Sequence, residues 1–179
     1  MNAYRTWLDV ALEAAEEASS HVREAWRSHH TVESKGFRDI VTETDRAAES
    51  IIVDHLTTAF PDHSVTAEER GSDAQSQDVR WFVDALDGTT NFSRDNPNFS
   101  LAIGAVEGQR PVVAVVCDPL RSMTFAAVRG CGATLNGELI HSSRRETLDA
   151  ALLGIENPRD PDLRREMLDR LTALYPEVR

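Results

Sequence analysis

The stretch Trp81-Phe-Val-Asp84-Ala-Leu-Asp87-Gly-Thr-Thr-Asn-Phe92 places two aspartates and a Gly-Thr-Thr turn directly after an apolar run. The apolar run predicts a short buried strand, so Asp84 and Asp87 are expected at its end. Their carboxylates, with the Leu86 carbonyl between them, form the kind of oxygen-rich ligand group that Mg²⁺ prefers. This stretch therefore predicts a site for a hard divalent cation at the end of a strand.

The turn after the two aspartates is suited to an anion. Gly88 permits a tight backbone turn, and the amides of Gly88 and Thr89 would face an anion if they open a helix. Metal-assisted phosphoryl transfer requires a cation beside a phosphate, and the two predicted sites are adjacent. An ordinary Asp-Gly turn in a polar loop is the alternative interpretation. An EF-hand is excluded, because the Asp-x-Asp-x-Asp-Gly spacing and the closing glutamate are absent.

The residues around this stretch predict an α+β fold. Apolar residues at helical spacing predict a long helix over 4–28 and a second helix that begins at a capping box, Thr42–Asp45, and ends at Pro61. The segment 31–41 between them is expected to be extended or turned. Alternating or continuous apolar residues predict consecutive strands at 64–67, 80–85, 99–105, 112–117 and 124–128, before a hairpin turn at Asn136-Gly137. We therefore expect an antiparallel sheet with the two helices packed on it.

Two more acidic clusters precede the first one in the chain. Glu68-Glu69 follows the predicted strand at 64–67, and Asp39-Ile-Val-Thr-Glu-Thr-Asp45 leads into the second helix. Taken alone, the first is most simply an exposed acidic pair in a loop, and the second is most simply a helix cap. It is their order and spacing relative to the aspartate stretch that point to a shared function.

In that order, the three clusters resemble the motifs of the inositol monophosphatase family. The family has a Gly/Lys-rich turn with Asp-x-Val-Thr-x-x-Asp, then Gly-Glu-Glu, then Asp-Pro-(Ile/Leu)-Asp-Gly-Thr-Thr-Asn-Phe. The matching segments here are Lys35-Gly-Phe-Arg-Asp39-Ile-Val-Thr-Glu-Thr-Asp45, Ala67-Glu68-Glu69, Asp84–Phe92, Pro97–Ser100 and Gly130–Gly137. The chain departs from the pattern at Ala67, which replaces a glycine, and at Ala85, which replaces a proline. The similarity runs from about residue 5 to about residue 175.

The resemblance implies a Mg²⁺-dependent phosphatase with two or three bound ions. Glu68, Asp84 and the Leu86 carbonyl would hold the first ion, and Asp84 and Asp87 would reach the second. Glu68 would also hold a weaker third ion. Mn²⁺ is an alternative ion, and Li⁺ is an expected inhibitor.

The resemblance also implies roles around the substrate. The amides of Gly88 and Thr89 would hold the phosphate. Asp45 would bond to the Thr89 hydroxyl, and this pair with Glu68 would orient and deprotonate a metal-bound water for in-line attack on phosphorus. Two further site candidates lie within the matching motifs, Lys35 and Thr90. An inositol monophosphate is the first-ranked substrate, and sugar phosphates, histidinol phosphate and 3′-phosphoadenosine-type nucleotides are the alternatives.

Composition restricts the partners. The net charge is −11 with no visible basic patch, so we expect no binding to nucleic acid or to a membrane surface. No apolar run reaches the length of a membrane span, and the first residues lack the features of a signal peptide. Cys117 and Cys131 make neither a disulfide framework nor a zinc pattern, which predicts reduced thiols in a cytoplasmic protein. The family resemblance predicts a homodimer.

The last part of the chain predicts the start of a second domain. We expect an α+β metal-binding domain over 1–147, and the beginning of an α/β domain over 148–179 with a strand at 150–156 and a helix from Pro161. A strand and helix normally return to a parallel strand, and the Trp-Asp motif of the family's second half does not occur after Trp81. The chain is therefore expected to be part of a longer protein. The alternative function is a weakly active or inactive member that acts as a metal-binding or interaction module.

Overall fold

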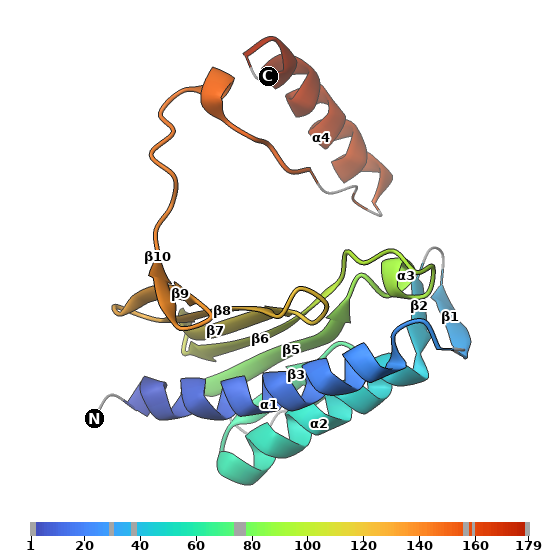
Figure 1. The fold of residues 1–179 in the computed structure, drawn as a ribbon, viewed down its shortest axis with the longest axis vertical. Coiled ribbons are helices and arrows are strands. Elements are labelled where there is room, and N and C mark those ends of the chain that lie inside the picture. The colour runs from blue at the N-terminus through green and yellow to red at the C-terminus, as the bar shows by residue number, and fades with distance from the viewer. Residues whose placement is uncertain are drawn as a thin grey trace. The chain divides into compact units, whose positions relative to one another are not determined.

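The computed structural model describes residues 3–28, 31–36, 39–73, 78–155, 158 and 160–177 (Figure 1). The chain divides into two compact units, Met1–Ile140 and His141–Arg179. The first unit contains α1 (Ala3–Ala25), β1 (Val32–Gly36), β2 (Asp39–Thr42), α2 (Glu43–Ala59), β3 (Ser64–Ala67), β4 (Gly71–Asp73), β5 (Val79–Asp87), α3 (Thr89–Phe92), β6 (Ser100–Glu107), β7 (Arg110–Asp118), β8 (Met123–Val128), β9 (Gly132–Leu135) and β10 (Glu138–Ile140).

A mixed sheet forms the centre of the first unit. In the part of the chain that is described, eight strands pair in the order β10-β9-β8-β7-β6-β5-β3-β4. Neighbours from β5 to β10 are antiparallel, as is the β3–β4 pair, whereas β3 and β5 run parallel. A separate antiparallel hairpin, β1–β2, leads into α2. The predicted α+β fold is confirmed, but the parallel pair and the short strand β4 were not predicted.

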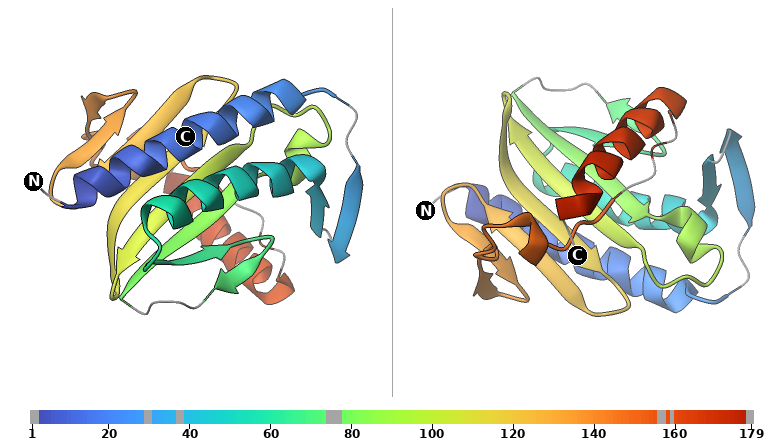
Figure 2. Two further views of the ribbon diagram at one scale, coloured as in Figure 1. Left: turned by 90° about the horizontal axis from the view of Figure 1, so that it is seen from below. Right: turned by 90° about the horizontal axis from the view of Figure 1, so that it is seen from above.

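Helices α1 and α2 lie side by side across one face of the sheet (Figure 2). Alternate strand residues point into the core beneath them, among which Trp81, Leu101 and Val115 are completely buried. The other face is only partly covered, because Phe82, Val116 and Phe125 are 45%, 40% and 37% exposed. Side chains on this second face are therefore the ones that the helices leave accessible.

The start of α2 follows the predicted capping box. The Thr42 side chain accepts the Asp45 backbone N–H, and the Asp45 carboxylate accepts the Thr42 backbone N–H. The helix ends at Ala59, just before Pro61. The predicted hairpin turn is also present, since Asn136 and Gly137 have positive φ angles of 51° and 84° between β9 and β10.

The second unit contains short helical elements and one longer helix. A 3₁₀ turn spans Leu148–Ala150, α4 spans Pro161–Leu174, and another 3₁₀ turn spans Tyr175–Glu177. The predicted helix from Pro161 is confirmed, and Asp160 caps it by accepting the N–H groups of Asp162 and Leu163 at 2.8 and 3.0 Å.

The predicted strand at 150–156 is wrong where it can be judged. Residues 151–155 form no strand, and Glu156 lies outside the described residues. A strand requires a hydrogen-bonded neighbour, and none is present for this segment in the described structure; Leu152 is 97% exposed. None of the described helices is long and apolar enough to cross a membrane.

Candidate metal and phosphate site

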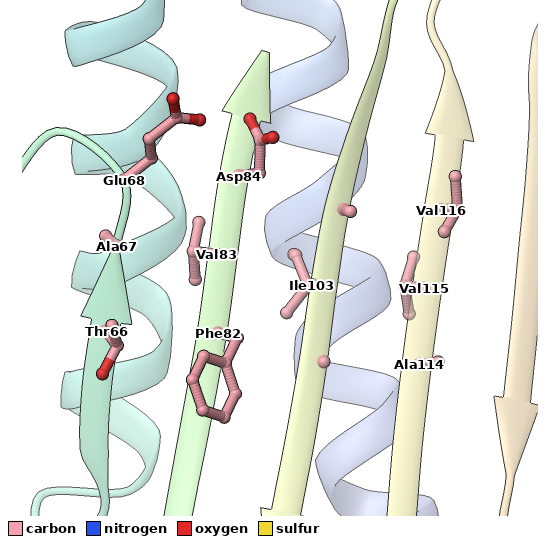
Figure 3. Close-up of a pocket in the computed structure, with 12 residues that line it drawn as sticks. Thr66, Ala67, Glu68, Phe82, Val83, Asp84, Ile103, Ala114, Val115 and Val116 are labelled. Atoms are coloured by element: carbon pink, nitrogen blue, oxygen red, sulfur yellow. The ribbon is translucent and has the colours of Figure 1, made fainter. Parts of the chain in front are cut away.

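The parallel pairing of β3 with β5 brings Glu68 beside Asp84. In the register of this pair, Ala67 lies opposite Val83, so the next residue on each strand, Glu68 and Asp84, lies at the same edge of the sheet. The Glu68 N–H continues the ladder by donating to the Val83 carbonyl at 3.2 Å. Glu68 comes directly after β3, Asp84 lies near the end of β5, and the Glu68 side chain reaches toward the Asp84 carboxylate (Figure 3). An antiparallel pair would have placed these strand ends at opposite edges.

A bulge in β5 directs Asp87 to the same face as Asp84. Asp84 lies opposite Ala102 and Asp87 lies opposite Ser100, so β5 has one more residue than β6 over this interval. Without the extra residue, Asp84 and Asp87 would point to opposite faces, because strand side chains alternate. Their partners on β6 are two residues apart and share a face. The bulge therefore gathers both aspartates on the accessible face of the sheet.

The acidic groups repel one another in the absence of a cation. The pKa of Asp84 is raised to about 7, first by burial, then by the negative charges of Glu68 and Asp87. A hydrogen bond with the Glu68 side chain also favours protonated Asp84. The Leu86 N–H opposes these effects by donating to Asp84 Oδ1 at 3.2 Å. Asp84 therefore changes its charge near neutral pH.

The geometry fits a cation held partly by water. Among the described residues, no three His, Cys, Asp or Glu side chains stand close enough together to hold a metal ion by themselves. Mg²⁺ commonly binds through one or two carboxylates and keeps several waters. Glu68 and Asp84 provide such a pair, and a cation between them would relieve the repulsion that raises the Asp84 pKa.

Asp45 links α2 to the turn after β5. It is 4% exposed, and its Oδ1 accepts the Thr89 hydroxyl at 2.7 Å. Its Oδ2 accepts the Thr42 backbone N–H at 2.9 Å and the Thr42 hydroxyl. Burial raises the pKa of Asp45, and the hydrogen bonds from Thr42 and Thr89 oppose that shift. The Thr89 hydroxyl also lies 3.1 Å from the Leu86 carbonyl oxygen, so this one side chain connects Asp45 to the bulge.

Gly88 forms the turn between β5 and α3. Its φ angle is 95°, in the left-handed region that side chains other than glycine rarely adopt. A Cβ atom here would lie 3.1 Å from the Asn98 carbonyl oxygen and 3.2 Å from Phe99 Cβ, so the turn is also closely packed. Thr90 is exposed on α3. Lys35 lies in β1, and its side chain is outside the described part of the structure.

A shallow depression of about 460 Å³ extends from the two carboxylates along the accessible face (Figure 3). Glu68 and Asp84 are its charged residues, and the rest of its lining comes mainly from apolar positions on β5, β6 and β7. Asp45, Asp87 and Thr89 are not part of the lining. The depression therefore contacts one edge of the acidic group and does not enclose it.

Sequence reasoning missed Glu49, on α2. This carboxylate is 1% exposed and accepts the N–H of Glu69 at 2.7 Å, immediately after Glu68. The sequence did contain a signal. Glu49 lies one helical turn after Asp45 and shares its side of α2 with Ile52 and Leu56, where an acidic residue is unexpected.

Comparisons with known proteins agree with the motifs. The family model for the inositol monophosphatase family matches residues 3–174. The Nus factor SuhB of Escherichia coli strain K12 is 39% identical over 154 residues, which cover 84% of this chain and 58% of that protein. Inositol monophosphatase 3 of Solanum lycopersicum is 41% identical over 154 residues, with the same coverage of 84% and 58%. The chain thus spans little more than half the length of these relatives.

Solved structures show the same likeness. The extragenic suppressor protein suhB from Bartonella henselae superposes with a TM-score of 0.91 at 29% identity, over 97% of this chain and 69% of that one. The IMPase from Thermotoga maritima gives a TM-score of 0.80 at 31% identity, over 97% and 67% of the two chains. The family match covers nearly the whole sequence and includes all three acidic clusters. This chain therefore belongs to the inositol monophosphatase family.

Proposed function

We propose that this chain carries the cation- and phosphate-binding residues of a Mg²⁺-dependent phosphatase that hydrolyses a small phosphate monoester. The observation that supports this most directly is the approach of Glu68 and Asp84 at one sheet edge, next to the Asp45–Thr89 hydrogen bond. These groups come from separate parts of the chain. Ordinary surface carboxylates have no reason to be gathered where the charges of Glu68 and Asp87 raise the pKa of Asp84.

The proposed ligands of the cations are Glu68, Asp84, Asp87 and the Leu86 carbonyl oxygen. All are oxygen donors, which suits Mg²⁺, with Mn²⁺ as an alternative. A bound Mg²⁺ would supply an acidic water near neutral pH and neutralise charge on the phosphoryl group. We propose two or three ions and inhibition by Li⁺, as the family membership implies.

The remaining residues would orient the phosphate and a water. The first N–H groups of a helix have no partner within the helix, so the turn at Gly88 and Thr89 can present donors to a phosphate. Thr89 donates its hydroxyl proton to Asp45, so its oxygen retains the capacity to accept a hydrogen bond from a water. Glu68 would take up a proton from that water. Lys35 and Thr90 are secondary candidates, because they lie within the matching motifs.

The proposed substrate is a small phosphorylated metabolite, and an inositol monophosphate ranks first because inositol monophosphatases 1, 2 and 3 of Solanum lycopersicum, which are similar to this chain, are named for this activity. Sugar phosphates, histidinol phosphate and phosphoadenosine-type nucleotides share the same phosphate ester chemistry. A homodimer and a cytoplasmic location stay predictions.

The test is phosphate release from a panel of these monoesters, with Mg²⁺, with EDTA and with added Li⁺. We expect turnover with Mg²⁺ alone, and its loss in Asp84→Asn. Asp54→Asn is the matched control, because Asp54 is an exposed carboxylate on α2. Equal turnover in Asp84→Asn and Asp54→Asn would refute the assignment. Mg²⁺ binding without any turnover would instead support the metal-binding module.

A further inference from the structure

The buried carboxylate of Glu49 makes its contacts with the residues that follow Glu68. Its Oε2 accepts the Glu69 N–H at 2.7 Å, and the Arg70 N–H also bonds to the carboxylate. The Arg70 Nε lies 3.6 Å from Glu49 Oε1, and the Arg70 guanidinium donates to the Ser50 hydroxyl at 2.6 Å. Helix α2 therefore holds the start of the β3–β4 turn in two ways: it binds the backbone N–H groups of the turn, and it binds the Arg70 side chain.

The same turn is held from the opposite side by β5. The Glu68 N–H donates to the Val83 carbonyl at 3.2 Å, one residue before Asp84. Glu68 thus sits between an anchor on β5 and an anchor on α2. These backbone contacts fix the Cα of Glu68 at the position from which its side chain reaches toward the Asp84 carboxylate in Figure 3.

Burial of this charge calls for an explanation. Glu49 is 1% exposed, and burial is the largest cause that raises its pKa. Burying an acidic side chain is unfavourable unless hydrogen bonds and opposite charges offset the loss of its solvation. An amide or hydroxyl side chain could satisfy a single backbone N–H, whereas a carboxylate accepts two neighbouring N–H groups and a guanidinium together.

We infer that Glu49 is a positioning residue, which holds the Glu68 carboxylate opposite Asp84 before a cation binds and so raises the Mg²⁺ affinity of the site. This role presupposes the proposed function, because it concerns the same cation. Residues that orient metal ligands commonly change metal affinity about 10- to 100-fold when they are replaced. If Glu49 only anchored a surface turn, its loss would leave Mg²⁺ affinity unchanged.

The experiment measures Mg²⁺ binding by isothermal titration calorimetry. Glu49→Gln keeps the size of the side chain but replaces one carboxylate oxygen with an NH₂ group, a donor that faces the donors of Glu69 and Arg70. We expect its Mg²⁺ affinity to fall about 10- to 100-fold, whereas Asp54→Asn, which removes the same charge from the exposed side of α2, stays within about twofold of the parent chain.

Asp84→Asn separates the two proposals. If Asp84→Asn loses the cation and Glu49→Gln binds it as tightly as Asp54→Asn does, the positioning role is refuted and the proposed function stands. If Asp84→Asn binds Mg²⁺ as well as the parent chain does, the proposed site itself is wrong.

A second measurement does not depend on whether Glu49→Gln folds. In the parent chain without Mg²⁺, hydrogen exchange by NMR should show the Glu69 and Arg70 amides protected to the same degree as strand amides of β3. Exchange at the rate of an unstructured loop would show that Glu49 does not hold this turn in advance, and would overturn the inference.

Discussion

We expect Asp84→Asn to stabilise the cation-free protein while it destroys the cation site. In the folded chain the pKa of Asp84 rises from 3.8 to about 7. The folded state therefore binds more protons than the unfolded state between these values, so this group makes stability fall as pH rises from about 4 to about 7. At pH 8 the ionised Asp84 carboxylate destabilises the folded state by the full free-energy cost of its raised pKa. Replacing Asp84 with asparagine removes this cost.

The size of the effect follows from the pKa. The rise in the Asp84 pKa corresponds to a free-energy cost of at most about 4 kcal/mol to the folded state, at about 1.4 kcal/mol per pKa unit. Asp84 is only partly buried, and solvent screening reduces the expected gain to about 1–2 kcal/mol. Asparagine can still accept the Leu86 N–H, so little is lost in exchange.

The assay is urea unfolding in EDTA, followed by tryptophan fluorescence. The chain's three tryptophans, Trp7, Trp26 and Trp81, all lie in the first unit and report on it alone. We expect the stabilisation at pH 8 and little difference at pH 4, where Asp84 is protonated in the folded state and close to half protonated in the unfolded state, so that only a small part of the cost remains. Added Mg²⁺ should reverse the order at pH 8, because only the parent chain gains from binding. Equal stability of both proteins in EDTA at pH 8 would refute the claim that the acidic groups repel one another.

Three further perturbations test the surroundings of the site. Gly88→Ala should destabilise the chain by about 1–2 kcal/mol in urea unfolding, because φ is 95° there, and unchanged stability would contradict the close packing of the turn. Thr89→Val should cost about 1–3 kcal/mol in the same assay, because it leaves the buried Asp45 oxygen without its donor, whereas Thr89→Ser should cost less. His63 accepts the Trp81 N–H, and burial lowers its pKa. The stability of the chain should therefore fall as pH drops below the ordinary histidine pKa of 6.5. A His63→Phe variant should lose this pH dependence of stability between pH 7 and 5.

The sequence predicted those parts of the fold that local signals determine. The strand at Ser64–Ala67 and the capping box at Thr42 occur at the predicted positions, because side-chain alternation and cap chemistry depend on near neighbours in the chain. The strand at 150–156 was wrong for the converse reason. Its apolar residues favour a strand, but pairing needs a neighbour that no local pattern specifies.

The sequence named the acidic residues of the candidate site, but it did not predict how the fold brings them together. The parallel direction of β3 relative to β5 depends on which strands pair, and the bulge between Asp84 and Asp87 depends on the register with β6. Glu49 was overlooked because its partners are backbone amides, 20 residues later, whose position only the fold decides. The strand pairing, the bulge and the Glu49 contacts all depend on residues that lie far apart in the chain.

One side of α2 supports both loops that carry the acidic residues. Asp45 holds the turn after β5 through Thr89, and Glu49, one helical turn later, holds the turn after β3. Asp45 and Glu49 are therefore fixed to the same rigid helix, about 6 Å apart along its axis. Neighbouring strands lie about 4.8 Å apart, whereas two oxygens on one Mg²⁺ lie about 3 Å apart. The side chains of Glu68 and Asp84 therefore need to tilt only slightly toward one another to share a cation, provided that neither loop shifts. Asp45 and Glu49 therefore contact both loops from one side of α2, which gives each of these two buried acids a structural role.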